Sequence, residues 1–296
     1  MSIPGALTTV LTADLKPRDD ELDLFGMTHQ GLVRRENQDH FLIGTLHREL
    51  AVHGTSLPAM DRLLLRGERF ATFAVVADGV GGVAGGAAAS KRAVETIANY
   101  VQFTLRCFAA ADPHHELPFV EALRGAVVDA DAAVRALRPD DRDQQGAGGG
   151  PATTLTMAIG VWPRAYVLQV GDSRCYLYGD GALRRLTRDQ TAAQDLVDRG
   201  ELTQSEAARS PLQHMLTSAL GGRDAAPVVT AVDLRRESIL LLCSDGLTRH
   251  VSDAELAESL RGLRSAEQTG RDLMQMALDR GGHDNITIVI GCARRA

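Results

Sequence analysis

The chain has 296 residues, of which 44% are hydrophobic and 24% are charged, and its formal net charge at pH 7 is -6. This length allows two average domains or one large α/β domain, and the composition is sufficient for a buried core. The negative charge argues against a general affinity for nucleic acid, so an anionic partner would have to be attracted locally. No stretch is apolar for long enough to span a bilayer.

The N-terminal residues carry no basic leader before their short apolar run, which argues against secretion. The cysteines are scattered and form no CxxC pair. We therefore predict reduced thiols in the core of a cytoplasmic protein. The four are Cys107, Cys175, Cys243 and Cys292.

In the first third of the chain, the sequence pattern predicts an arm, three strands and an insertion. Residues 1–20 are polar and contain prolines, so we expect a flexible arm before a single domain of residues 21–296. Residues 47–68 have no regular period and are interpreted as an insertion, either a partner-docking element or a tolerated surface loop. The strands are expected at residues 22–29, 40–46 and 69–78, and the basic residues around the insertion are His47, Arg48, Arg62, Arg66 and Arg69.

Helix and strand patterns follow in separate blocks. Alanine-rich stretches with apolar residues at helical spacing predict two long helices. A glycine-rich loop at residues 138–151 precedes a meander of short strands, and Asp180-Gly181 is typical of a hairpin turn. The helices are expected at residues 86–109 and 117–138, and the strands at 152–162, 165–171, 174–180 and 182–187.

The C-terminal part combines a polar, helix-prone segment with two strands, two helices and a final strand. Serine or threonine followed three residues later by glutamate or glutamine predicts three helix starts. Glycines where two of the helices end are expected to be left-handed. The polar segment is residues 188–222, the strands are 227–234, 238–245 and 286–293, the capping pairs are Thr203 with Glu206, Ser252 with Glu255 and Ser265 with Gln268, and the glycines are Gly262 and Gly281.

This order of elements predicts an α+β fold. Strands and helix pairs come in blocks and do not alternate, as they would in a doubly wound parallel sheet. Hairpin connections imply antiparallel strands, and each sheet needs both of its faces covered. We therefore expect a four-layer α-β-β-α sandwich of two packed, mainly antiparallel sheets flanked by helix pairs.

Aspartates mark the ends of the apolar strands. Three runs end at Asp78, Asp172 and Asp245, whereas Asp39 and Asp284 precede two others. Because the end of one antiparallel strand lies beside the start of the next, we expect all five carboxylates at one edge. Each aspartate alone is more simply a turn or cap residue, but five together favour a site for divalent cations, which offset their repulsion. Oxygen ligands suit Mg²⁺ or Mn²⁺ better than zinc.

Two further features lie beside these acids. Gly79 follows Asp78 and lets the backbone approach closely, so its carbonyl is another candidate ligand. Arg34 and Arg35 lie just upstream of Asp39, and a guanidinium can bind phosphate oxygens through two parallel hydrogen bonds. A solvated arginine is the simpler interpretation without the acids, but beside the acid cluster the pair suggests an anionic substrate.

Five motifs occur in a fixed order: "GLVRRENQD", "VVADGVGG", "VGDSRCYLY", "LLLCSDGL" and "GGHDNITIVI". Together they resemble the metal-dependent serine/threonine protein phosphatases of the type 2C family, especially its compact bacterial branch. The resemblance extends from about Phe25 to Cys292. It implies an α-β-β-α sandwich with two Mn²⁺ or Mg²⁺ ions in a core site at one edge, and a weaker third ion.

The resemblance also implies a role for each matching residue. Asp78 would bridge the two main ions, and the carbonyl of Gly79 would bind one of them. Arg34 matches the phosphate-binding position of the family, and Asn285 would support the neighbouring ligand. The other ligands would be Asp245 and Asp284 in the second site, Asp39 through bound water, and Asp172 at the third ion.

The implied activity is hydrolysis of phosphoserine and phosphothreonine in proteins by a metal-activated water, without a covalent intermediate. Expected partners are phosphorylated proteins and a bacterial Ser/Thr kinase, and the chain is expected to be a monomer that binds neither nucleic acid nor membrane. The alternatives are a phosphoprotein-binding module without catalysis and a two-metal phosphodiesterase. The complete set of acids argues against the first, and the negative charge against the second.

The chain departs from the family pattern at several positions. Val80 stands where many eukaryotic relatives have a histidine that could protonate the leaving group, so the proton donor is open. His40 and His283 lie near the motifs, but a lone histidine is more often structural. By the resemblance, residues 188–222 correspond to the mobile flap of bacterial relatives, and their polar composition suits a solvated lid and a plain pair of surface helices equally. In that segment, Ser210-Pro211 and His214 stand where relatives have a His-Pro and an asparagine.

Overall fold

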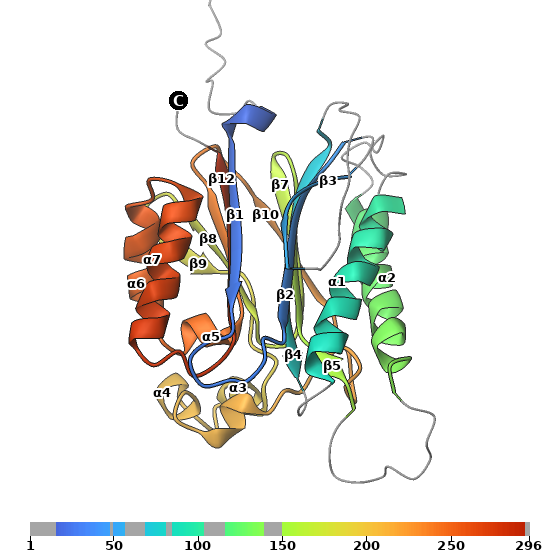
Figure 1. Ribbon diagram of the computed structural model, residues 1–296, viewed down its shortest axis with the longest axis vertical. Coiled ribbons are helices and arrows are strands. Elements are labelled where there is room, and N and C mark those ends of the chain that lie inside the picture. The colour runs from blue at the N-terminus through green and yellow to red at the C-terminus, as the bar shows by residue number, and fades with distance from the viewer. Residues whose placement is uncertain are drawn as a thin grey trace, which may run out of the picture.

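The structure, a computed structural model, describes residues 16–47, 50–56, 69–80, 85–103, 116–138 and 150–293. Two antiparallel sheets pack face to face, and a pair of helices covers the outer face of each (Figure 1). The predicted α-β-β-α sandwich is confirmed. The strands carry apolar side chains on both faces, so each sheet buries one face against the other sheet and one against helices.

The first sheet comprises, in spatial order, β1 (Leu22–His29), β12 (Ile286–Ala293), β11 (Ile239–Cys243), β8 (Arg174–Gly179) and β9 (Ala182–Arg185). Its outer face is covered by α6 (Asp253–Arg261) and α7 (Ala266–Asp279). Leu256 and Leu273 of these helices share one buried cluster with Ile288 of β12. This packing requires the helical spacing of apolar residues that the sequence shows.

The second sheet comprises, in spatial order, β10 (Val228–Asp233), β7 (Arg164–Val170), β6 (Leu155–Val161), β4 (Ala71–Val80), β2 (Asp39–Leu46) and β3 (Leu50–Thr55), with β5 (Ala152–Thr153) paired to the end of β4. Its outer face is covered by α1 (Gly86–Phe103) and α2 (Glu116–Arg135). Ile97 and Leu123 of these helices are buried with Phe73, Leu155 and Leu168 of the sheet.

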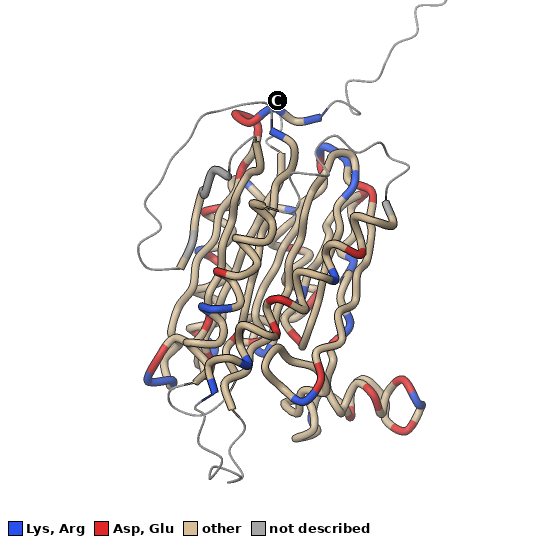
Figure 2. The backbone as a smooth tube through the Cα atoms, turned by 90° about the vertical axis from the view of Figure 1, so that its right-hand side faces the viewer, with Lys and Arg blue, Asp and Glu red and all other residues tan. Residues whose placement is uncertain are grey.

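A third buried cluster lies between the two sheets and includes Phe41, Val76, Cys175, Leu242 and Val289. Figure 2 shows few charged residues along the central strands, whereas acidic and basic residues occupy the outer elements and the ends. The sandwich is therefore held together mainly by apolar burial, and charged groups inside it call for a separate explanation.

The cysteine prediction is confirmed within the described ranges. Cys175, Cys243 and Cys292 are buried and form no disulfide. Burial raises the pKa of the Cys243 thiol to about 12, so this group stays protonated at neutral pH. Cys107 lies outside the described residues.

Most of the capping and turn residues named from the sequence adopt the predicted conformations. Asp180 and Gly181 have φ angles of 51° and 77°, as a two-residue hairpin turn requires. Reciprocal capping boxes form at Thr203 with Glu206 and at Ser252 with Glu255, while Ser265 caps α7 without a reciprocal bond from Gln268. Gly281 has a φ of 115°, but Gly262 has a φ of -85°, so the predicted left-handed conformation is wrong at Gly262.

Several boundaries differ from the prediction, and three of the differences have a clear reason. The insertion at residues 47–68 contains β3, an edge strand whose sequence, LAVHGT, does not alternate between apolar and polar residues. β4 continues past Asp78 to Val80, because β5 pairs with its last residues. A short helix, α5 (Asp245–Thr248), follows β11 directly, and its four residues are too few to show a helical period.

The described ends of the insertion contact the chain before β1. Asp19 Oδ2 lies 3.5 Å from Nε2 of His47, and Asp19 Oδ1 lies 3.2 Å from Nη1 of Arg69. Both basic side chains are buried. They therefore anchor the chain before β1 and are not free for a partner, while Arg48, Arg62 and Arg66, like residues 1–15 of the predicted arm, lie outside the described residues.

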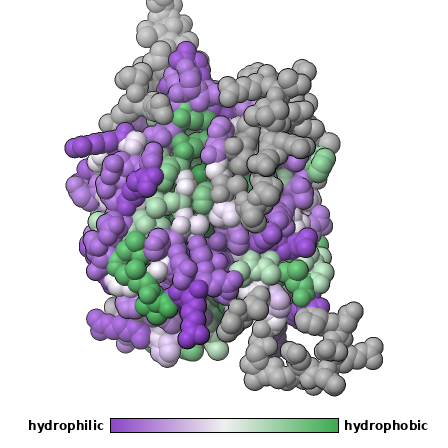
Figure 3. Space-filling view, viewed as in Figure 1, coloured by the Kyte–Doolittle hydropathy of each residue, from purple (hydrophilic) through white to green (hydrophobic). Residues whose placement is uncertain are grey.

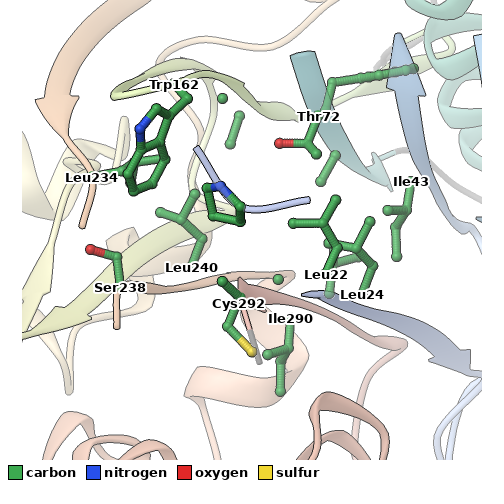
Figure 4. Close-up of a pocket in the computed structure, with 18 of the residues that line it drawn as sticks. Leu22, Leu24, Ile43, Thr72, Trp162, Leu234, Ser238, Leu240, Ile290 and Cys292 are labelled. Carbon is green, nitrogen blue, oxygen red and sulfur yellow. The ribbon is translucent and has the colours of Figure 1, made fainter. Parts of the chain in front are cut away.

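A cavity of about 100 Å³ lies between the sheets near the start of β1 and the end of β12. Figure 4 shows side chains from both sheets pointing into it, among them Leu22, Ile43, Leu240 and the single tryptophan, Trp162. The lining is mostly apolar. The two sheets therefore leave a gap in their packing at this end of the sandwich.

The surface is mainly hydrophilic on the face that Figure 3 shows, with a few hydrophobic patches. Exposed large hydrophobic side chains include Leu32 and Val33 in the loop after β1. Among the helices in the described part of the chain, none is long and apolar enough to cross a membrane.

Gly26 allows the close approach of the two sheets, and we expect Gly26→Ala to destabilise the fold. A Cβ atom at this position would lie 2.5 Å from Cε2 of Phe41 and 2.8 Å from Cδ1 of Ile43. Overpacking of this kind lowers the free energy of unfolding by about 1–3 kcal/mol, which urea denaturation would measure.

Gly179→Ala is the matched control, because a Cβ atom there would meet only Ser238 Oγ at 3.8 Å. The control should change stability by less than about 0.5 kcal/mol. Equal stabilities of the two variants would contradict the account of the sheet contact.

Candidate metal and phosphate site

The structure brings all five predicted aspartates to one edge of the sandwich, where β2 begins and β4 ends. Asp39 and Asp78 are directly opposite each other in the register of these two strands. Burial raises the pKa of the Asp78 carboxyl well above its usual range, and four neighbouring carboxylates raise it further. These neighbours are, in order of effect, Asp39 on β2, Asp245 at the start of α5, Asp172 after β7 and Asp284 before β12.

Asp39 is 2% exposed and is held by groups of the opposite sheet. Its Oδ2 accepts hydrogen bonds from Ser244 Oγ at 2.8 Å and from Thr287 Oγ1 at 2.7 Å. Its Oδ1 is buried and has no hydrogen-bond partner among the described residues. An unpaired carboxylate oxygen in the interior is costly, so Oδ1 is a natural ligand for a cation or a proton.

Asp78 is positioned through its backbone. Its N–H donates to Thr154 Oγ1 at 3.0 Å, and its carbonyl accepts bonds from Thr154 N and Thr153 Oγ1, both at 2.9 Å. At Gly79, a Cβ atom would lie 2.4 Å from the carbonyl oxygen of Gly86 at the start of α1. Glycine is therefore required here because another backbone approaches, and not because of an unusual φ angle.

The loop that carries Asp172 is fixed on both sides. Gly171 N–H donates to Gln190 Oε1 at 2.6 Å, and its carbonyl accepts from Gln190 N–H at 3.1 Å. Ser173 Oγ lies 2.8 Å from Thr154 Oγ1, within the same group of hydroxyls that holds Asp78. The position of Asp172 is thus tied to the core and to the start of the predicted flap.

Arg34 forms a two-pronged pair with Asp284. Its Nε donates to Asp284 Oδ1 at 2.7 Å, and its Nη2 donates to Oδ2 at 2.8 Å. The arginine side chain is 54% exposed, whereas that of Asp284 is 14% exposed. The guanidinium therefore lies at the boundary between the acid cluster and solvent, where an incoming anion could reach it.

The loop that carries Arg34 is held by Asn285. The side-chain amide of Asn285 donates to the carbonyls of Gln30 at 2.8 Å and Glu36 at 2.9 Å. Its Oδ1 accepts from the N–H of Gln38 at 2.9 Å. Asn285 thus closes the loop at three points, and this gives a physical basis for the supporting role that the resemblance implies.

A second guanidinium, from Arg249, also lies in the cluster. Its Nη1 donates to Asp284 Oδ2 at 2.8 Å, and its Nη2 donates to Asp245 Oδ2. Burial opposes its charge, but the neighbouring carboxylates raise the pKa of Arg249 above its usual range. Arg249 lies at the end of the short helix α5 that begins with Asp245.

The protonation behaviour divides the acids into two groups. Burial raises the pKa of Asp39 to about 7, and the pKa values of Asp172 and Asp245 are raised for the same first reason. The pKa of Asp284 is lowered despite its burial, because Arg34 and Arg249 favour its ionised form. Positive charge from the chain therefore neutralises Asp284 more fully than the other acids.

The donor set fits a divalent cation. Within the described ranges, no three His, Cys, Asp or Glu side chains are arranged so that they could hold a metal ion as they stand. Arginines instead occupy the carboxylate oxygens of Asp245 and Asp284. The remaining acids are oxygen donors with raised pKa values, and Asp39 Oδ1 is unpaired, so a cation would remove repulsion that the protein alone leaves in place.

The two histidines near the motifs, His40 and His283, have different surroundings in the structure. His40 is half-buried, its Nδ1 lies 2.9 Å from Ser90 Oγ, and burial lowers its pKa to about 4. This supports the structural interpretation of His40. His283 stacks on His250 with ring centroids 5.1 Å apart. Val80, at the position after Gly79, has no ionisable group and offers no proton.

The predicted flap contains α3 (Ala192–Asp198), α4 (Gln204–Ala207) and the 3-10 helix η5 (Pro211–His214). These elements lie at the same end of the sandwich as α5 (Figure 1). Nδ1 of His214 lies 3.0 Å from Nη2 of Arg249, so this segment contacts the acid cluster directly.

Sequence analysis missed the hydroxyl groups and Arg249. The hydroxyls come from Thr153, Thr154, Ser173, Ser244 and Thr287, all of which are completely buried. A weak indication was available, since Ser173 and Ser244 are direct neighbours of two of the predicted aspartates. Arg249 lies four residues after Asp245, a spacing that becomes informative only once a helix is expected there.

Comparison with known proteins identifies the family. A family model described as "Protein phosphatase 2C" matches residues 53–287. The serine/threonine protein phosphatase PstP of Mycobacterium tuberculosis is 35% identical over 261 residues, which cover 88% of this chain and 43% of PstP. The serine/threonine phosphatase stp of Listeria monocytogenes is 32% identical over 218 residues, which cover 73% of this chain and 82% of that protein.

The solved structures agree with this result. The catalytic domain of PstP in complex with two manganese ions has a TM-score of 0.67 and 28% sequence identity, and the match covers 93% of this chain and 99% of that chain. The present chain therefore belongs to the protein phosphatase 2C family, as the five motifs predicted. It spans less than half the length of PstP itself.

In metal-free protein, we expect thermal stability to fall as the pH rises from about 4 to about 7. The pKa of Asp39 is raised from its ordinary value of 3.8 to about 7 in the folded chain. The folded state therefore holds this proton more tightly than the unfolded state, and the resulting stability is complete at low pH and is lost as the pH passes 7. Thermal melts in chelator across this range would measure the effect.

Asp39→Asn is the matched variant, because its side chain does not titrate, and its melting temperature should depend less on pH. Saturating Mn²⁺ should also weaken the pH dependence of the wild-type chain, since a bound cation favours ionised carboxylates. An equal pH dependence of the variant and the wild-type chain in chelator would be incompatible with this account.

Asn285→Ala should loosen the loop that carries Arg34. The substitution removes the hydrogen bonds to the carbonyls of Gln30 and Glu36 and from the N–H of Gln38, and each such bond contributes about 0.5–1.5 kcal/mol. Hydrogen exchange of the loop should accelerate, and the free energy of unfolding should fall. Asn99→Ala, at an exposed position of α1, is the control and should leave both unchanged.

Proposed function

We propose that this chain is a metal-dependent protein phosphatase that hydrolyses phosphoserine and phosphothreonine. The observation that carries the proposal is the two-pronged pair of the half-exposed Arg34 with Asp284, at the rim of five gathered aspartates. The names of PstP and stp as serine/threonine phosphatases support the same activity. We extend the catalytic domain over residues 21–296, with residues 1–20 as an arm and 188–222 as a flap.

The proposed ligands are the carboxylates of Asp39, Asp78, Asp172, Asp245 and Asp284 and the carbonyl of Gly79. They would hold two Mn²⁺ or Mg²⁺ ions in a core site and a weaker third. When bound, such ions would activate water and offset the negative charge of phosphoryl oxygens. The manganese complex of the PstP catalytic domain supports this assignment.

The side chains of the protein have separate tasks in this proposal. The guanidinium of Arg34 would bind two phosphoryl oxygens, in the same two-pronged manner in which it binds Asp284. Asn285 would hold the loop so that this guanidinium is positioned before substrate arrives. Asp39 would be kept in place by Ser244 and Thr287. The buried cysteines would take no part.

The physiological partners would be phosphorylated proteins, and the enzyme would oppose a bacterial Ser/Thr kinase. We expect a cytoplasmic monomer that binds neither nucleic acid nor membrane. A phosphoprotein-binding module without catalysis would need Arg34 but not the complete set of acids. A phosphodiesterase acting on nucleic acid would need a positive surface, whereas the formal net charge of the chain is -6.

Hydrolysis of a phosphothreonine peptide tests the proposal. The purified chain should release phosphate with Mn²⁺ or Mg²⁺ and not with chelator. Asp78→Asn should lower the rate by about 100-fold or more, because the carboxylate proposed to bridge the two main ions is lost. Asp172→Ala should have a smaller effect, since Asp172 is assigned to the weaker ion.

Asp233→Asn is the matched control, because the side chain of Asp233 is 82% exposed on β10 and pairs only with Arg164 among the contacts described for it. It should keep the wild-type rate. Binding of the phosphopeptide without release of phosphate under any metal would favour the binding module instead.

A further inference from the structure

Arg249 links the acid cluster to the flap through three acceptors. Its guanidinium donates to Asp284 Oδ2 and Asp245 Oδ2, and its Nη2 also lies 3.0 Å from Nδ1 of His214. A guanidinium has no acceptor, so this ring nitrogen must accept, and the proton of a neutral His214 must lie on Nε2. The Arg249 side chain is 32% exposed, so it is partly withdrawn from solvent.

The guanidinium of Arg249 would compete with a bound divalent cation for the same carboxylates. Asp245 and Asp284 are two of the proposed metal ligands, and Asp284 Oδ2 accepts bonds from both Arg34 and Arg249. A divalent cation bound to the same carboxylates would repel a guanidinium a few ångströms away and would compete for the same oxygen lone pairs. When a divalent cation binds these carboxylates, Arg34 and Arg249 cannot both keep all of their present hydrogen bonds.

Arg34 and Arg249 differ in the contacts that each would lose when a cation binds. Arg34 contacts only Asp284 within the cluster and is the more exposed of the two. Arg249 bridges Asp245 and Asp284, so its single positive charge offsets part of the negative charge that a bound divalent cation would offset. Its third acceptor, His214, lies on the flap and carries no negative charge when neutral, so it is an acceptor that Arg249 can keep after release.

We propose that Arg249 is a built-in counter-ion of the metal-free centre, which offsets part of the negative charge of Asp245 and Asp284 until a divalent cation displaces it. The inference rests on the proposed function, because it concerns the same centre. Arg249 then stabilises the metal-free chain and weakens its affinity for metal. An arginine with a purely structural role would instead stabilise the metal-free and metal-bound chains equally.

The test is Arg249→Gln, which removes the charge and keeps most of the length. Calorimetric titration of the chelator-treated full chain with Mn²⁺ should give a dissociation constant lower than that of the wild-type chain, on the order of tenfold. The melting temperature in chelator should fall. The melting temperature in saturating Mn²⁺ should stay close to that of the wild-type chain, because the displaced arginine no longer contributes.

Two variants separate charge from geometry. Arg249→Lys keeps a positive charge but cannot bridge two carboxylates in the same way, so its Mn²⁺ affinity should lie between those of the wild-type chain and Arg249→Gln. Arg280→Gln removes an arginine that pairs with Glu255 outside the centre and should leave Mn²⁺ affinity unchanged.

The outcomes are distinct. Weaker Mn²⁺ binding by Arg249→Gln, or an equal loss of melting temperature in chelator and in Mn²⁺, would overturn the counter-ion role and show that Arg249 only supports the ligands. If the wild-type chain itself fails to bind Mn²⁺, the proposed function is wrong. A gain of affinity in Arg249→Gln but not in Arg280→Gln would confirm the inference.

Discussion

Repulsion among buried carboxylates at one edge of the sandwich is the constraint on which the rest of this structure depends. Like charges held close together disfavour their own ionisation and the folded state that assembles them. The protein tolerates the cluster because strands of both sheets mount the acids rigidly. Buried hydroxyls then bond Asp39 Oδ2, and guanidinium groups neutralise Asp284. The raised pKa values of the other acids show that this compensation is incomplete.

Much of the fold could be predicted from the sequence, because the elements that form the core have a clear hydrophobic periodicity and clear turn and capping residues. The alternation of apolar strands with hairpin turns predicted the two sheets, and serine or threonine caps located helices α6 and α7. Prediction failed where an element shows no period. Strand β3 reads LAVHGT, without alternation of apolar and polar residues, and helix α5 has only four residues.

The acids of the site could be predicted for a related reason, since each lies at or near an end of an apolar strand that the pattern delimits. The groups that position them could not. Thr154 and Ser173 lie on either side of the β6–β7 hairpin and meet only when these two strands pair, and Thr287 is one of several threonines in strands. No local pattern distinguishes a threonine that bonds a buried carboxylate from one that merely suits a strand.

The hydrogen bonds from Ser244 and Thr287 to Asp39 join the two sheets at the acidic end, whereas the cavity near Trp162 separates them at the other end. The two sheets are therefore bonded to each other at the acidic end and leave a cavity at the opposite end. Function limits the stability of the acidic end, because a more stable arrangement there would require removal of the acids. The cavity near Trp162 has no such limit, so larger apolar side chains that fill it are expected to raise thermal stability without changing the chemistry of the site.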